Sequence, residues 1–265
     1  MIELVVTDLD GSLWHREEIH PATRAAWSEL EQRGIPVIVA TGRRLSTTRE
    51  PLARAGLAPA AVILNGALAV ELATGECFHR RHYETADATK VLNAFRLVGL
   101  DPCVYVEHSD IDIYVGSQPS TNPGHLASFG SRAVCANLDE IVATVPVLSF
   151  GIIGHEPEPL AHAVSAIGIG AEVHLDADSL WGGDTLTVAP LGLSKWAGVL
   201  AYCDRAGIDS GRVLAVGDGP NDRELLTHAA VAVVPTSGFE QAVKAADHLV
   251  GPPSEGGWAE ILDFV

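Results

Sequence analysis

The sequence places carboxylates where apolar runs end, and these are the first residues that could do chemistry. Asp8 and Asp10 come just after the strand-like run 2–7, and Gly11 lets the chain turn sharply after them. An aspartate can act as a covalent nucleophile in phosphoryl transfer, and a carboxylate two residues later can carry the leaving-group proton. Short acidic residues also end strands and cap turns. Taken alone, the Asp8 and Asp10 pair slightly favours this structural interpretation over a catalytic one.

A hydroxyl residue follows the next apolar run, residues 37–40, as Thr41-Gly42-Arg43. A helical segment begins near Leu45, so free amides at a helix start would lie beside the Thr41 hydroxyl, and both suit a phosphate group. A plain helix N-cap by Thr41 explains the same residues. The position at the end of an apolar strand is what brings phosphate binding into consideration.

A lysine opens a later helical segment, at Lys195, which extends to about Ala206. The chain has three lysines against fourteen arginines. A lysine in a chain that otherwise uses arginine indicates a need for a compact ammonium charge. The alternative is a solvated surface lysine.

The fourth segment, residues 217–222, carries Asp218, Asn221 and Asp222 between an apolar run and a helical one. Mg²⁺ prefers one or two carboxylates completed by water and substrate phosphate oxygens, so Asp218 is a candidate metal ligand. Every residue of this segment is also a good turn former. A tight turn followed by a capped helix therefore stays open.

The elements that must position these residues read as strands alternating with helices at both ends of the chain. The apolar runs are continuous, as in strands covered by helices on both faces, and open α/β sheets bind ligands at the carboxyl ends of their strands. At the N-terminal end, we expect strands at 3–7, 36–40 and 61–64 and helices at 21–33 and 45–55. At the C-terminal end, we expect strands at 213–216, 230–234 and 248–250 and helices at 222–228 and 239–246.

The middle of the chain has a different pattern, in which apolar and polar residues alternate between turn-like segments. This pattern indicates antiparallel hairpins with helices. We therefore predict an α/β fold in which residues 1–83 and 186–265 form a Rossmann-like parallel-sheet core, a three-layer α/β/α arrangement. Residues 84–185 would form an inserted α+β cap domain.

Charge and composition exclude several classes of partner. The net charge is −17, with 34 acidic against 17 basic residues, which argues against binding nucleic acid or an anionic membrane. Four scattered cysteines suggest neither a zinc site nor a disulfide framework. With no secretory signal and no apolar stretch long enough to cross a bilayer, we expect a soluble, cytoplasmic protein.

Taken in order, the four segments resemble the haloacid dehalogenase (HAD) superfamily, specifically its Cof-type phosphatase branch with a C2 (type IIB) cap. The resemblance spans nearly the whole chain and implies that Asp8 is the nucleophile and Asp10 the general acid/base. It also implies phosphate binding by Thr41, Gly42, Lys195 and Asn221, a metal site of Asp8, Asp10 and Asp218, and Asp222 beside that metal. Arg43, Asn65 and Gly66 match positions of possible substrate contact. Ser12 and Trp196 depart from the usual residues without removing a catalytic group.

The expected function is a Mg²⁺-dependent phosphatase that hydrolyses a small phosphorylated metabolite, such as a sugar phosphate, through an aspartyl-phosphate on Asp8. We expect the carboxylates of Asp8, Asp10 and Asp218 to converge around one ion, with the Asp10 backbone carbonyl among its ligands. One alternative is a phosphotransferase, such as a sugar-phosphate mutase, that uses the same residues. The other is a module that binds a phosphorylated ligand without turnover.

Overall fold

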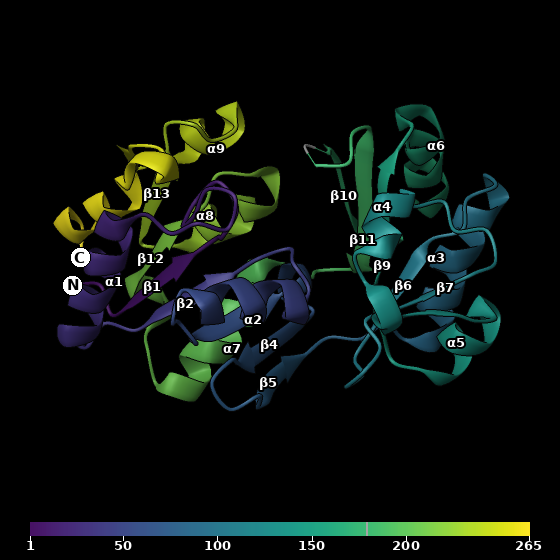
Figure 1. Ribbon diagram of the computed structural model, residues 1–265, viewed down its shortest axis with the longest axis horizontal. Helices are drawn as coiled ribbons and strands as arrows, with labels where there is room; N and C mark the ends of the chain where they lie inside the picture. Colours follow the sequence, from purple (N-terminus) through teal and green to yellow (C-terminus); the bar gives the residue numbers. More distant parts are fainter. Residues whose placement is uncertain (179) are drawn as a thin grey trace. The chain divides into compact units, whose positions relative to one another are not determined.

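The chain divides into two compact units in the computed structural model, which describes residues 1–178 and 180–265 (Figure 1). Unit 1 comprises Met1–Arg80 and Ser194–Val265, and unit 2 comprises Arg81–Leu193. The two ends of the chain therefore fold together, and the middle forms a body of its own.

Unit 1 contains an eight-stranded sheet in the order β14-β13-β12-β1-β2-β3-β4-β5. The first six strands are parallel to one another, and β4 and β5 complete the sheet as antiparallel strands. The strands are β1 (Leu4–Thr7), β2 (Val37–Ala40), β3 (Ala60–Ile63), β4 (Leu68–Glu71), β5 (Cys77–Arg80), β12 (Val213–Val216), β13 (Val231–Pro235) and β14 (His248–Val250).

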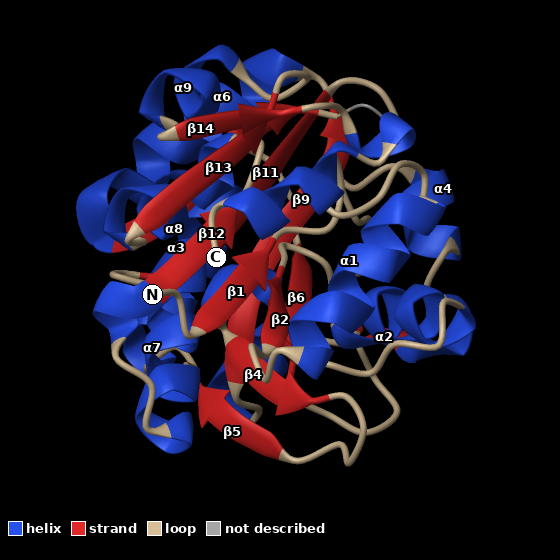
Figure 2. Cartoon of the chain, turned by 90° about the vertical axis from the view of Figure 1, so that its left-hand side faces the viewer, coloured by secondary structure: helices blue, strands red, loops and turns tan. Residues whose placement is uncertain are grey.

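Helices cover this sheet on both faces, as the continuous apolar strands require (Figure 2). They are α1 (Pro21–Gln32), α2 (Leu45–Arg54), α7 (Lys195–Ala206), α8 (Arg223–His228) and α9 (Glu240–Ala245). Leu4 and Val6 of β1 face the core that α7 and α8 share. Thr7 has the opposite parity and accepts a hydrogen bond from Trp258 Nε1 at 3.0 Å, and Trp258 in turn stacks on Trp27 of α1.

Unit 2 contains a six-stranded sheet in the order β10-β11-β9-β6-β7-β8, antiparallel except for the β7–β8 pair. Its strands are β6 (Cys103–Val106), β7 (Ile113–Val115), β8 (Ala133–Cys135), β9 (Val147–His155), β10 (Ala171–Ala177) and β11 (Asp184–Pro190). Its helices are α3 (Thr85–Leu97), α4 (Pro123–Ala127), α5 (Leu138–Thr144) and α6 (Pro157–Ile167). Phe95 of α3, Leu160 of α6 and Phe150 of β9 meet in its core, so helices pack against the sheet.

The predicted fold class is confirmed: a largely parallel sheet covered by helices, with a second, antiparallel α+β unit. The second boundary differs from the expected one, because unit 2 extends to Leu193 rather than to residue 185. The reason is β11, which pairs with both β9 and β10 and so belongs inside the sheet of unit 2. Within the described residues, no helix is long and apolar enough to cross a bilayer.

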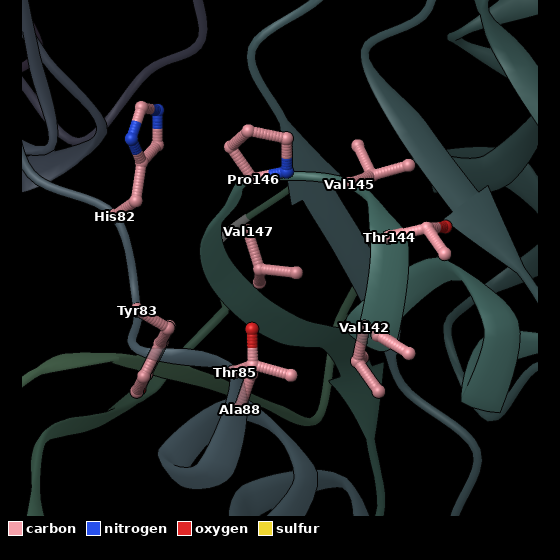
Figure 3. A pocket seen from close by; sticks show the side chains of 10 residues that line it. His82, Tyr83, Thr85, Ala88, Val142, Thr144, Val145, Pro146 and Val147 are labelled. Atoms are coloured by element: carbon pink, nitrogen blue, oxygen red, sulfur yellow. The ribbon is translucent and has the colours of Figure 1, made fainter.

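Unit 2 also contains a cavity of about 290 Å³ between the start of α3 and the turn from α5 into β9 (Figure 3). Thr85 and Thr144 are among its lining residues. At its edge, His82 Nε2 lies 3.1 Å from Glu107 Oε2. All of its lining residues lie in unit 2, and none of them is among the candidate site residues predicted from the sequence.

Candidate active site

The candidate site begins where β1 and β12, neighbours in the sheet of unit 1, reach their carboxyl ends. The two strands are parallel, and Thr7 is in register with Val216. The amide of Asp8 continues this pairing, because it donates to the carbonyl of Val216 at 2.8 Å. The register therefore sets Asp8 beside the loop that begins at Gly217 and carries Asp218.

Three carboxylates meet at this point. One oxygen each of Asp8, Asp218 and Asp222 lies within 4.8 Å of the others. Lys195 Nζ donates to Asp8 Oδ1 at 2.6 Å and to Asp222 Oδ1 at 2.7 Å, and only 1 % of Lys195 is exposed. Ser194 caps the start of α7 by accepting from the amide of Ala197, which places Lys195 in the first turn.

Backbone geometry makes room for this cluster. Asp222 Oδ2 accepts hydrogen bonds from the amides of Asp218 at 3.0 Å and Gly219 at 2.9 Å, so this side chain shapes its own loop. Ser12 Oγ donates to Asp218 Oδ1 at 2.9 Å. Gly11 has a φ of +80°, and a Cβ there would lie 2.4 Å from Asp218 Oδ2. Both the backbone conformation and the lack of space therefore require a glycine at this position.

The electrostatics of the cluster reflect an excess of negative charge. Burial, together with Asp222 and Asp218, raises the pKa of Asp8 well above its usual range, although Lys195 opposes the shift. Burial and the neighbouring Asp222 also raise the pKa of Asp218, to about 6. Burial alone would lower the pKa of Lys195, but the carboxylates of Asp222 and Asp8 outweigh it and keep the ammonium charged.

The donor set fits a divalent cation. Three carboxylates with one ammonium between two of them leave two negative charges to be balanced in a buried place. All the cluster oxygens are hard ligands, which suit Mg²⁺. The raised pKa values of Asp8 and Asp218 share their causes, which are burial first and then repulsion from the neighbouring carboxylates, and a bound cation would oppose both.

The carboxylate of Asp10 does not join this cluster. It lies 52 % exposed and accepts hydrogen bonds from Arg43 and from the indole of Trp14. We expected the carboxylates of Asp8, Asp10 and Asp218 to converge, whereas the structure brings Asp222 to the cluster in the place of the Asp10 side chain. The predicted metal contact of Asp10 was its backbone carbonyl, and this contact stays a prediction.

The predicted phosphate-binding residues other than Lys195 form a second group around the carboxyl ends of β2 and β3. Asn221 Nδ2 donates to Asn65 Oδ1 at 3.1 Å. A Cβ at Gly42 would lie 3.1 Å from Asn65 Oδ1 and 3.6 Å from Asn221 Nδ2, so three loops meet there. Thr41 is buried, and its Oγ1 accepts from the amide of Arg43 at 3.1 Å.

Gly66 links this group to Lys195. Its φ is +106°, and a Cβ there would lie 2.1 Å from the carbonyl oxygen of Ser194. The preceding Asn65 also has a positive φ, of 53°. The loop after β3 therefore packs directly against the start of α7, and each predicted site residue lies in unit 1.

Two contact residues escaped the sequence analysis, Trp14 and Glu17. Trp14 Nε1 donates to Asp10 Oδ1 at 2.9 Å, and Glu17 Oε1 lies 2.5 Å from Arg43 Nη1. The spacing of four residues between Asp10 and Trp14 was a signal, although a weak one. No sequence signal pointed to Glu17, because its partner Arg43 lies 26 residues further along the chain.

Comparison with known proteins identifies the family. The profile of the haloacid dehalogenase-like hydrolases matches residues 5–262. A phosphoglycolate phosphatase of Methanopyrus kandleri is 23% identical over 99% of this chain and 96% of that protein. An HMP-PP phosphatase of Cronobacter sakazakii is 25% identical over 94% of this chain and 89% of that protein.

A solved structure of a HAD-superfamily phosphatase from Bacteroides thetaiotaomicron has the same fold, with a TM-score of 0.82 at 20% identity. It covers 100% of this chain, and this chain covers 95% of it. The resemblance inferred from the four sequence segments is thus confirmed at the level of the family. Because the family profile extends over nearly all of its length, the chain belongs to the haloacid dehalogenase-like hydrolases.

Proposed function

We propose that the chain is a Mg²⁺-dependent phosphatase that hydrolyses a small phosphorylated metabolite through an aspartyl-phosphate on Asp8. The observation that carries the proposal is the buried Lys195, which bridges Asp8 and Asp222 in a cluster of three carboxylates. A charged lysine fixes the Asp8 oxygen it contacts and leaves the other oxygen for attack on phosphorus. Membership in a hydrolase family supports the same conclusion.

Asp8, Asp218 and the backbone carbonyl of Asp10 would hold the Mg²⁺, with Asp222 beside them. Bound there, the ion would supply positive charge against the phosphate oxygens. Asp222 already has its oxygens occupied by Lys195 and by the amides of Asp218 and Gly219. It is therefore suited to shaping the site rather than to direct metal binding.

The reaction then proceeds in two half-reactions carried by two aspartates. An Asp8 oxygen forms a bond to phosphorus while the bond to the leaving oxygen breaks, and Asp10 gives that oxygen a proton. Water next attacks the aspartyl-phosphate, Asp10 takes the proton from the water, and Asp8 and inorganic phosphate are released. In both steps the Lys195 ammonium would offset the negative charge of the phosphate oxygens, and Thr41 and Asn221 would donate hydrogen bonds to them.

The nucleophile is tested by Asp8→Asn, which keeps the shape of the side chain but removes the attacking charge. We expect phosphate release to fall by at least about 10³-fold, because no other group can form the covalent intermediate. Asp204→Asn, an exposed aspartate on α7, is the matched control and should keep wild-type turnover. Near-normal hydrolysis by Asp8→Asn would contradict the proposal.

Substrate choice is open to a direct screen. The relatives are named for phosphoglycolate and HMP-PP, so these two compounds and a panel of sugar phosphates are the first to assay. Phosphorus NMR of the products separates hydrolysis, which yields inorganic phosphate, from transfer to a second hydroxyl. Ligand binding without phosphate release, with or without EDTA, would instead indicate a non-catalytic module.

A further inference from the structure

The Asp10 carboxylate is held by a two-bond fork from Arg43. Arg43 Nε donates to Asp10 Oδ2 at 2.5 Å, and Nη2 donates to Oδ1 at 2.7 Å. Trp14 Nε1 donates a third hydrogen bond, also to Oδ1, at 2.9 Å. A guanidinium that binds both oxygens of a carboxylate fixes its orientation as well as its position.

Arg43 is itself fixed by groups of the same unit. Its Nη1 contacts Glu17 Oε1 at 2.5 Å and the carbonyl of Thr47 at 3.1 Å. Its guanidinium lies 5.0 Å from the ring centroid of Trp14, which is fully buried. Glu17 has a positive φ of 64°, a strained conformation that the surrounding contacts must maintain.

The three bonds leave the two Asp10 oxygens in different states. A carboxylate oxygen accepts about two hydrogen bonds. From the described residues, Oδ1 receives two bonds and Oδ2 receives one, so Oδ2 keeps an acceptor site. The fork gives each oxygen one bond and fixes the plane of the carboxylate, and the Trp14 bond fills Oδ1, so Oδ2 is the oxygen left for a further partner.

We propose that Arg43 is a positioning residue, which orients Asp10 so that Oδ2 exchanges the proton with the leaving group. This inference rests on the proposed function of Asp10 as general acid/base. It differs from the substrate contact expected for Arg43 from the sequence, because the guanidinium is already committed to Asp10, Glu17 and Trp14. Arg43 acts through Asp10 and does not need to touch the substrate.

Two phosphate esters distinguish positioning of Asp10 by Arg43 from direct substrate binding by Arg43. 4-Nitrophenyl phosphate releases 4-nitrophenolate, a stable anion that departs without a proton. 2-Phosphoglycolate releases an alkoxide, which must receive a proton from a general acid as it leaves. We expect Arg43→Gln to lower kcat/KM for 2-phosphoglycolate by about 10²-fold, the lower range for loss of acid–base catalysis. For 4-nitrophenyl phosphate, kcat/KM should change by less than about threefold, since only proton transfer is affected. Arg43→Lys, which cannot form the fork, should rescue only part of the loss.

The double variant Asp10→Asn/Arg43→Gln completes the kinetic test. If Arg43 acts only through Asp10, kcat/KM of the double variant should be no lower than that of Asp10→Asn alone. Arg33→Gln, an exposed arginine paired with Glu29 on α1, controls for loss of an ion pair. An equal loss of kcat/KM for both esters, or a further loss in the double variant, would assign Arg43 to substrate binding and overturn the inference.

A second measurement does not depend on turnover. The indole N–H resonance of Trp14, assigned with Trp14→Phe, reports the bond to Asp10 Oδ1. This resonance should shift in Arg43→Gln and in Asp10→Asn but not in Arg33→Gln. An unchanged resonance in Arg43→Gln would show that Arg43 does not orient the Asp10 carboxylate, and would overturn the inference. If the wild-type protein released phosphate from another ester of the panel but not from 2-phosphoglycolate, that ester would take its place in the comparison. Absence of phosphate release from every ester of the panel would instead reject the proposed function, and the role of Arg43 in it.

Discussion

At the scale of single residues, Lys195 Nζ lies 2.6 and 2.7 Å from carboxylate oxygens of Asp8 and Asp222, and its side chain is wholly buried. Buried ion pairs add little net stability, because desolvation offsets their attraction. Removing one partner is different, since the other charge stays buried without compensation. Lys195 therefore has two roles, one in the reaction and one in permitting the acidic cluster to fold.

Lys195→Met tests the second role. We expect the free energy of unfolding of unit 1 to fall by about 3–5 kcal/mol, because two buried carboxylates lose their cation. Urea denaturation monitored by tryptophan fluorescence measures it. Lys90→Met, at an exposed lysine paired with Asp87, should change stability by less than about 1 kcal/mol.

The double variant Lys195→Met/Asp222→Asn gives a sharper result. Asp222→Asn removes one of the two uncompensated charges, so the double variant should recover part of the stability lost in Lys195→Met. A double variant as unstable as the sum of the single ones would show that the ion pair is not what couples these residues.

At the scale of elements, the sequence predicted the parallel strands of unit 1 well but missed its two antiparallel strands, β4 and β5. The strands that end at Thr7, Ala40 and Val216 are almost wholly apolar, and a polar motif follows each of them, so the gathering of the motifs at the carboxyl edge of one sheet could be inferred. The orientation of the Asp10 side chain could not. It depends on Arg43, 33 residues away, which carries no local signal of its partner.

The boundaries of the inserted unit were harder to predict for a physical reason. In β11, Leu186 and Val188 are fully buried and the strand ends in a buried Pro190, so its apolar content resembles that of a core strand. Only its antiparallel pairing with β9 and β10 assigns it to unit 2. The role of residues 84–185 as a substrate-specificity cap stays a prediction.

The contact between α7 and β3 gives a prediction at this scale. A Cβ at Gly198 would lie 2.5 Å from Val62 Cγ1, so the helix approaches the strand as closely as a glycine allows. Gly198→Ala gains about 1 kcal/mol of helix propensity but forces the two elements apart, which costs about 1–3 kcal/mol. We expect net destabilisation in urea unfolding, and also reduced turnover, because Lys195 lies one turn earlier on α7.

The control is Leu200→Ala on the same helix, where the side chain is 38 % exposed. It changes helix composition without altering the α7–β3 contact, and its effect on turnover should be small. If Gly198→Ala were as stable as wild type with full activity, the helix would have room to move, and the close approach would not be what positions Lys195.

At the scale of the whole molecule, the net charge of −17 makes any cation stabilising to some degree, so a specific Mg²⁺ site must be distinguished from general screening. An ion that binds only the folded state stabilises it by about 2.7 kcal/mol at one hundred times its Kd. For a unit of this size, that raises Tm by roughly 5–10 °C. We therefore expect MgCl₂ to raise the Tm of unit 1 well beyond NaCl at equal ionic strength, with EDTA reversing the effect.

The variant Asp218→Asn decides whether this stabilisation comes from the carboxylate cluster. It should remove most of the Mg²⁺-specific rise in Tm, because Asp218 is a proposed ligand, while the response to NaCl stays unchanged. Asp209→Asn, at a carboxylate 65 % exposed and outside the cluster, alters net charge equally and should keep the full Mg²⁺ response. If both variants responded to Mg²⁺ as the wild type does, the ion would be acting on the surface charge of the whole chain, and the metal site would have to lie elsewhere.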